Sequence, residues 1–193
     1  MSTFSGIGLG FVHNGNGKVG QAIIWATTPL RHLLSSKKRY ETPSHVFIWF
    51  EYKDGRRVYF EALEGHGWLG PKEISSVDDW VAECPEKRWQ EQISLLPWYS
   101  ETQIQEAYNF CERMKDYWTY KTNQLPLLLR TVAPIANAIV ASSPNGVICS
   151  EAASRVLHND FLDFREICGV KQHDYINPRM LYEGCKYITK RTT

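Results

Sequence analysis

Two runs of β-branched and aromatic residues, at 46–52 and 57–62, form the strongest pattern of the chain. Residues of these types are typical of strands, and the residues at 53–56 between the runs carry Asp-Gly at their centre, as tight hairpin turns do. The apolar, Gly-rich segment 4–12 is predicted as a further strand, and residues 92–96 as a strand of the same sheet. The pattern therefore predicts a small antiparallel sheet.

Three other segments have the spacing of helices. Residues 19–34 carry apolar side chains at roughly helical intervals, interrupted by a proline. A second helix is predicted from Ser100, which is the expected N-cap, with Gln103 placed to complete a capping box. The third is predicted over residues 147–157, directly after a loop that contains glycine. These helices are expected to pack against the sheet.

The most apolar segment of the chain is 125–141. It contains two prolines and an arginine and is shorter than the roughly 20 residues that a membrane-spanning helix needs. We therefore predict a buried helix or the wall of a cleft, and no transmembrane segment. No repeat or interdomain linker is evident, so we predict one α+β domain over residues 1–193, with an additional helical stretch around 100–145.

The charge pattern and composition give no sign of a nucleic-acid binder. The formal net charge is +1 and no long basic tract occurs, so nucleic-acid binding is not predicted. Seven Trp, ten Tyr and eight Phe are expected to serve core packing more than an aromatic groove. The first residues lack the charged and apolar regions of a secretory signal, which predicts cytoplasmic synthesis.

The five cysteines do not form a metal-binding or disulfide pattern. Their number is odd and no Cys-x-x-Cys pair occurs, so we interpret them as reduced thiols. His158 and His173 have no partner that the sequence identifies, and no spacing of the His-Glu-x-x-His type is present. We therefore predict no metal site and no cofactor.

Three residues suggest nucleophilic chemistry: Cys149 near the start of a helix, His45 before the strongest strand, and Glu61 at the end of the partner strand. A free thiol titrates near about pH 8.5 and needs help to ionise at neutral pH. A helix N-terminus and a nearby imidazolium both favour the thiolate. A carboxylate on the other ring nitrogen would fix the tautomer of the imidazole. We predict Cys149 as nucleophile, His45 as base and Glu61 as orienting group.

Each of these residue types also has an ordinary structural role. A lone helical cysteine is usually a small buried hydrophobe, and the sequence does not fix the register that decides whether His45 and Glu61 share a face of the sheet. Glu64 is an alternative orienting acid. Glu151 is expected to favour the helix N-terminus through its charge, and His66 to lie in an exposed loop.

Four short stretches resemble the permuted papain-like cysteine hydrolases, relatives of NlpC-type cell-wall peptidases. They are Ser-His-Val-Phe-Ile at 44–48, Val-Tyr-Phe-Glu-Ala at 58–62, Ile-Cys-Ser-Glu at 148–151 and Ile-Asn-Pro-Arg-Met-Leu at 176–181. The Gly-Asp-Ile-Ile element that this family carries near its N-terminus is not evident. The order of histidine, glutamate and cysteine is the reverse of ordinary papain-like enzymes, as a circular permutation implies.

The resemblance implies a papain-like fold and a cysteine-dependent amidase or peptidase with the site Cys149, His45 and Glu61. It suggests peptides of the bacterial cell wall as substrates, with action at the cell envelope. A lipid acyltransferase or thioesterase on the same site is the alternative, and the apolar segment 125–141 suits an acyl chain. A non-catalytic binding or structural module on the same fold is the rival hypothesis. Oligomeric state is not predicted.

Overall fold

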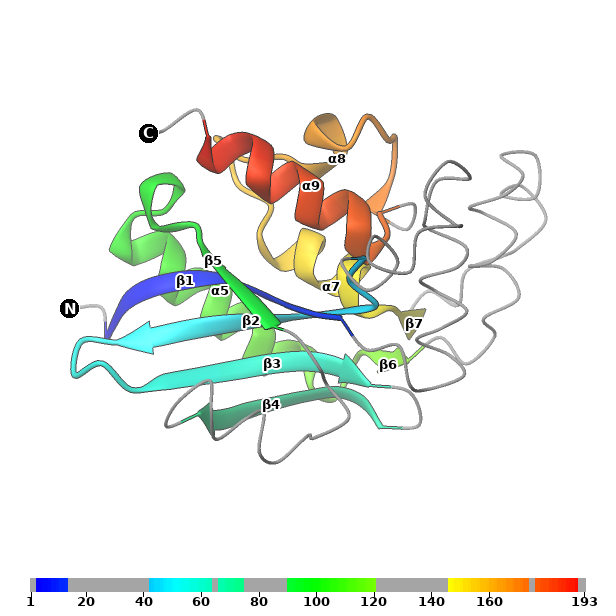
Figure 1. Ribbon diagram of the computed structural model, residues 1–193. Helices are drawn as coiled ribbons and strands as arrows, with labels where there is room; N and C mark the ends of the chain where they lie inside the picture. The colour runs from blue at the N-terminus through cyan, green and yellow to red at the C-terminus, as the bar shows by residue number, and fades with distance from the viewer. Residues whose placement is uncertain are drawn as a thin grey trace.

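The sheet is built around a hairpin of β2 (His45–Tyr52) and β3 (Arg57–Leu63). Figure 1 shows the protein as a computed structural model. The structure describes residues 3–13, 42–63, 66–74, 90–120, 146–173 and 176–190. Gly55 adopts a positive φ of 86° in the turn between the two strands, and its N–H donates to the carbonyl of Tyr52 at 2.9 Å. The predicted Asp-Gly hairpin is thereby confirmed.

Five antiparallel strands form the sheet in the order β4-β3-β2-β1-β5 (Figure 1). The additional strands are β1 (Phe4–Val12), β4 (Gly67–Ile74) and β5 (Gln90–Ser94). A short parallel pair, β6 (Thr119–Tyr120) and β7 (Gly146–Val147), forms a second, two-stranded sheet, and β6 contacts β3 and β4. Together with the helices, these strands make the described part of the chain an α+β fold.

The two faces of the sheet carry separate apolar clusters. Because side chains alternate along a strand, Ile48 and Phe50 point into the main core, whereas Phe47 and Trp49 belong to a smaller cluster on the other face with Tyr59. On that second face β1 presents glycine. A Cβ added to Gly10 would lie 1.9 Å from the ring of Phe47, so only glycine leaves room for the aromatic side chain.

Helices cover the face of the sheet that carries the main core. Helix α5 (Glu101–Met114) buries Ile104, Ala107 and Cys111 in that core, and α7 (Cys149–Val156) buries most of its residues there. A 3-10 helix, η1 (Leu96–Trp98), precedes α5. The chain ends with α8 (Phe164–Ile167) and α9 (Pro178–Thr189), and α9 lies beside α7 in Figure 1.

Several predicted features agree with these elements. Ser100 caps α5 and forms the capping box with Gln103. The strand predicted at 92–96 is found slightly earlier, as β5, in the same sheet. The predicted helix at 19–34 and the apolar segment 125–141 lie outside the described residues. None of the helices in the described part of the chain combines the length and hydropathy that a membrane crossing requires.

Candidate active site

His45 and Glu61 lie on the same face of the sheet, which settles the question that the sequence left open. Glu61 pairs with Phe47 in the β2–β3 register, and His45 is two residues from Phe47 along β2. His45 is therefore the diagonal neighbour of Glu61, within reach of a side-chain contact. Its Nε2 lies 2.8 Å from Oε2 of Glu61. Both side chains are shielded from solvent, with exposed fractions of 15% and 3%.

The backbone before β2 is held in place at this point. The N–H of Ser44 donates to the carbonyl of Val12 at 2.9 Å, and its hydroxyl donates to the same oxygen at 3.4 Å. Val12 is also the partner of His45 in the β1–β2 register. These contacts fix the backbone of His45, and so the base of its side chain, at the end of the sheet.

Cys149 reaches the other side of this imidazole from α7, of which it is the first residue. Cys149 is 4% exposed, and its thiol lies close enough to the imidazole of His45 for charge and side-chain hydrogen bonding to act between them. Because Nε2 of His45 already contacts Glu61, Nδ1 is the nitrogen left for the thiol. The structure thus brings together Cys149, His45 and Glu61, the three residues that the sequence analysis selected.

The electrostatics of the site favour a charged imidazole. Burial alone lowers the pKa of His45, because it penalises the imidazolium. The charge and hydrogen bond of Cys149, followed by those of Glu61, outweigh burial and raise this pKa from 6.5 to about 9. At neutral pH the arrangement therefore favours the charged imidazolium form of His45.

The start of α7 places backbone N–H groups that have no acceptor within the helix beside Cys149. Ile148 precedes the helix in extended conformation and has no polar side chain to cap it. The first intrahelical bond is donated by Ala152 to the carbonyl of Ile148 at 2.9 Å. The N–H groups of the first turn consequently lack partners within the helix and give this end a partial positive charge.

Ser150 and Glu151, which follow Cys149, hold the helix. The Ser150 hydroxyl donates to the carbonyl of Ile176 at 2.7 Å and is fully buried. Asn177 then caps α9 by accepting from the N–H of Met180. The two stretches at 148–151 and 176–181 that carry the family resemblance are therefore in direct contact.

Glu151 lies in the first turn of α7, as expected, where a negative charge interacts favourably with the helix dipole. It is fully buried, and its Oε1 lies 2.6 Å from Nη2 of Arg155, one turn along the helix. Neither residue of this ion pair belongs to the contact between His45 and Cys149. The structure thus gives Glu151 a role in holding its own helix.

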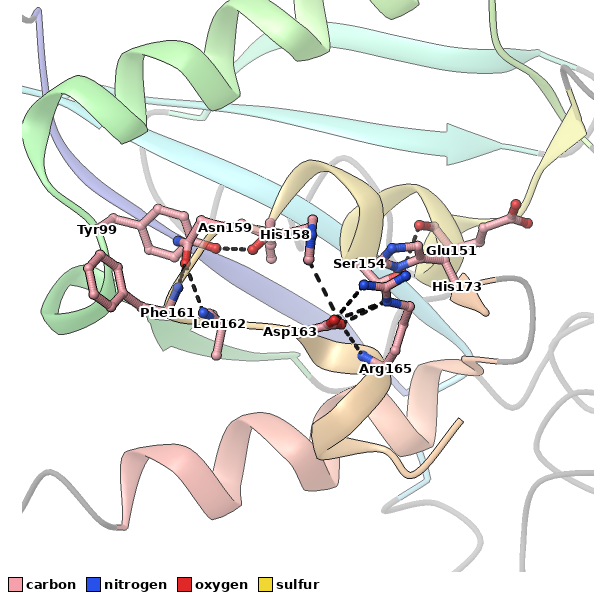
Figure 2. A network of polar contacts seen from close by, with 11 residues as sticks. Tyr99, Glu151, Ser154, His158, Asn159, Phe161, Leu162, Asp163, Arg165 and His173 are labelled. Carbon is pink, nitrogen blue, oxygen red and sulfur yellow. Dashed lines mark hydrogen bonds and ion pairs between the residues drawn. The ribbon is translucent and has the colours of Figure 1, made fainter. Parts of the chain in front are cut away.

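A polar network fastens α7 on the side shown in Figure 2. The hydroxyl of Ser154 donates to the carbonyl of Glu151 at 2.9 Å, and it lies 3.0 Å from Nδ1 of His173. The pair is not a serine nucleophile with its base, because the Ser154 proton is engaged by that carbonyl and the side chain is fully buried. Burial, with help from Arg165 and Arg155, lowers the pKa of His173 to about 4.

The second histidine of this network, His158, lies near the carboxylate of Asp163. Its Nδ1 lies 3.8 Å from Oδ1 of Asp163, and the Arg165 guanidinium binds the same carboxylate at 2.6 Å. At the far end of α7 the hydroxyl of Tyr99 donates to the carbonyl of Leu157. The helix that carries Cys149 is therefore held at its start, its middle and its end.

The remaining candidates from the sequence fall away from the site or outside the described residues. Glu64 belongs to the undescribed part of the chain, and His66 is exposed. One residue that sequence reasoning missed does touch the site: Nζ of Lys72 on β4 lies 3.4 Å from Oε1 of Glu61. The nearby Gly67 and Gly70 weaken the strand signal of this segment, so the sequence did not predict β4.

The other cysteines that the structure describes differ from Cys149. Cys111 and Cys185 are fully buried in the main core, and burial raises their pKa well above the usual value. Cys168 is partly buried, and burial raises its pKa to about 12. These three thiols are thus poor nucleophiles at neutral pH.

Comparison with protein-family models, with curated proteins and with solved structures gives no match.

Proposed function

We propose that the protein is a cysteine-dependent hydrolase of amide or other acyl bonds. In this proposal Cys149 is the nucleophile, His45 is the general acid and base, and Glu61 orients the imidazole. The observation that carries the proposal is the position of one imidazole between a thiol and a carboxylate, with Nε2 of His45 2.8 Å from Oε2 of Glu61. In such an arrangement the thiol transfers its proton to the imidazole, and the resulting thiolate is the nucleophile.

The reaction follows from these roles. The thiolate of Cys149 attacks the carbonyl carbon, and the imidazolium of His45 gives its proton to the leaving amine, which leaves a thioester on the enzyme. Water then attacks the thioester while His45 takes one of its protons, and the acid is released with the return of the thiolate–imidazolium pair. The first N–H groups of α7 are suited to stabilise the oxyanion that forms in both steps.

We further propose that the fold is a circularly permuted papain-like fold. The strands that bear His45 and Glu61 precede the helix that bears Cys149, the order that the resemblance implies. The nature of the acyl group is a separate matter, because the apolar segment 125–141 that would favour an acyl chain lies outside the described residues. Peptide amides and lipid esters both contain the kind of acyl bond that the proposed site would cleave.

The first test is the rate of iodoacetamide labelling at each cysteine between pH 5 and 9, read by mass spectrometry. At pH 6 we expect Cys149 to label at least about ten times faster than a free thiol, because only a thiolate reacts. His45→Ala should remove this advantage. Cys111, Cys168 and Cys185 serve as internal controls, and they should remain slow in both proteins.

The second test is turnover. The native protein and Cys149→Ala are compared on peptide amides, acyl thioesters and lipid esters, and hydrolysis by the native protein alone would support the proposal.

The labelling test can contradict the proposal. If Cys149 labels no faster than Cys111, or if His45→Ala does not change the labelling of Cys149, the proposed chemistry is wrong. A non-catalytic binding module would then be the better account of the same fold.

A further inference from the structure

Glu61 uses its two carboxylate oxygens on two different partners. Oε2 contacts Nε2 of His45 at 2.8 Å, and Oε1 contacts Nζ of Lys72 at 3.4 Å. The Glu61 side chain is only 3% exposed, whereas the Lys72 side chain is 44% exposed. The lysine therefore bridges a buried carboxylate to the solvent-accessible edge of the site.

The sheet places Lys72 at this oxygen through an irregularity in β4. Lys72 pairs with Tyr59, but Glu61 pairs with Leu69, so β4 contains one extra residue between these two pairs. Gly70 lies in this bulge at φ 134°, and a Cβ there would approach the ring of Phe60 to 2.6 Å. The ammonium also lies 5.7 Å from the centre of the Tyr59 ring, which gives it a second favourable contact.

From these contacts we propose that Lys72 is a positioning residue, which keeps Glu61 charged and turned toward His45; the inference rests on the proposed hydrolase function. Four ionisable groups meet here, one from each neighbouring element: His45 from β2, Glu61 from β3, Lys72 from β4 and Cys149 from α7. When the thiolate–imidazolium pair has formed, the two positive groups, His45 and Lys72, balance the two negative groups, Glu61 and Cys149. The net charge of the four groups is then zero. Without Lys72 the buried site would hold a net negative charge, which burial penalises.

A purely structural role makes a different prediction. In that case Lys72 would act only as an ion pair with one half-exposed partner, which contributes little to stability. Its loss would then leave the pH dependence of Cys149 labelling unchanged. A positioning role acts through charge. Removing the lysine makes the site more negative, so every acid there holds its proton more tightly. The pH midpoint of Cys149 labelling therefore separates the two roles.

The experiment compares Lys72→Met, which keeps the length of the side chain, with Lys72→Arg, which keeps the charge. The matched control is Lys53→Met, because Lys53 also pairs with a glutamate, Glu101 at 2.9 Å, but on the exposed surface. The readout is iodoacetamide labelling of Cys149 between pH 4 and 9. We expect Lys72→Met to raise the acid-side midpoint by about half a pH unit, which slows labelling about threefold below it.

Lys72→Arg and Lys53→Met should both keep the native midpoint. The inference is wrong if Lys72→Met labels with the native pH profile, or if Lys53→Met shifts the profile equally. If native Cys149 shows no labelling that depends on His45, the proposed function fails and this inference fails with it. A normal His45 dependence with an unchanged Lys72→Met profile would sink the inference alone.

Discussion

His45 shows how a few contacts at the residue scale reverse the usual effect of burial. A buried imidazole ordinarily loses its proton, since the charged form is poorly solvated. Here Cys149 and Glu61 flank the ring and raise its pKa to about 9. Because this value is above that of an unfolded chain, the imidazolium favours the folded state. The contribution is complete below about pH 6.5 and is lost as the pH rises through about 9.

The first prediction concerns Glu61→Gln, which keeps the shape of the side chain and removes its charge. A hydrogen bond between charged groups contributes about 1.5–3 kcal/mol, and each pKa unit corresponds to about 1.4 kcal/mol. We therefore expect the pKa of His45 to fall by about one to two units, as measured by NMR titration of the imidazole. His173 is the internal control, with a pKa that should stay near 4 in both proteins. An unchanged His45 titration would contradict the assigned role of Glu61.

The residue types of the candidate site could be predicted from sequence, but their contacts could not. The sequence offered candidates because each role needs a particular side chain: a thiol for the nucleophile (Cys149), an imidazole for the base (His45) and a carboxylate for the orienting group (Glu61). Their meeting depends on two facts that periodicity does not contain: the β2–β3 register, and the packing of α7 against β2. Lys72 was missed because a one-residue bulge brings it to Glu61, and a bulge has only a weak signal in sequence.

At the scale of elements, strong local signals were predicted and weaker ones were missed. The β2–β3 hairpin and the capped start of α5 follow from turn and capping chemistry that acts within a few residues. β4 was missed because glycine weakens a strand signal, and β4 contains Gly67 and Gly70. Helix α9 was also missed, although Asn177 at the N-cap and Pro178 at the first position are typical start signals.

The second prediction tests how α7 is held. The Ser150 hydroxyl joins the start of α7 to the carbonyl of Ile176, in a fully buried position. Ser150→Ala removes the donor and leaves a buried carbonyl without it, which costs about 1–3 kcal/mol. We expect this loss in the free energy of unfolding measured by urea denaturation. The control is Ser94→Ala, because Ser94 is exposed and its hydroxyl accepts from the N–H of Leu96, two residues along the chain.

Ser94→Ala should change the stability by less than about 0.5 kcal/mol, as surface substitutions usually do. Equal losses in the two variants would show that the contact between Ser150 and Ile176 does not stabilise α7. The comparison also bears on the site, since a looser α7 would move Cys149 relative to His45. Labelling of Cys149 at pH 6 should therefore slow in Ser150→Ala and stay unchanged in Ser94→Ala.

At the scale of the whole molecule, the candidate site exists only when distant parts of the chain are assembled. His45 and Glu61 belong to one hairpin, but Cys149 comes about ninety residues later, on a helix that packs against β2. The main core joins this helix to β1, β2 and β3 through shared buried residues. Formation of the site should therefore be as cooperative as formation of the core.

The last prediction follows from this dependence on the assembled fold. In urea at pH 6, labelling of Cys149 should slow as the protein unfolds, because an unfolded thiol with a pKa near about 8.5 is almost fully protonated. At pH 8.5, Cys111 and Cys185 should become reactive as they leave the core. In a two-state protein, the change in labelling at each pH has the same urea midpoint as the change in tryptophan fluorescence at that pH. Loss of Cys149 reactivity well before that midpoint would mean that α7 detaches while the sheet persists, so that the site and the core would not be one cooperative unit.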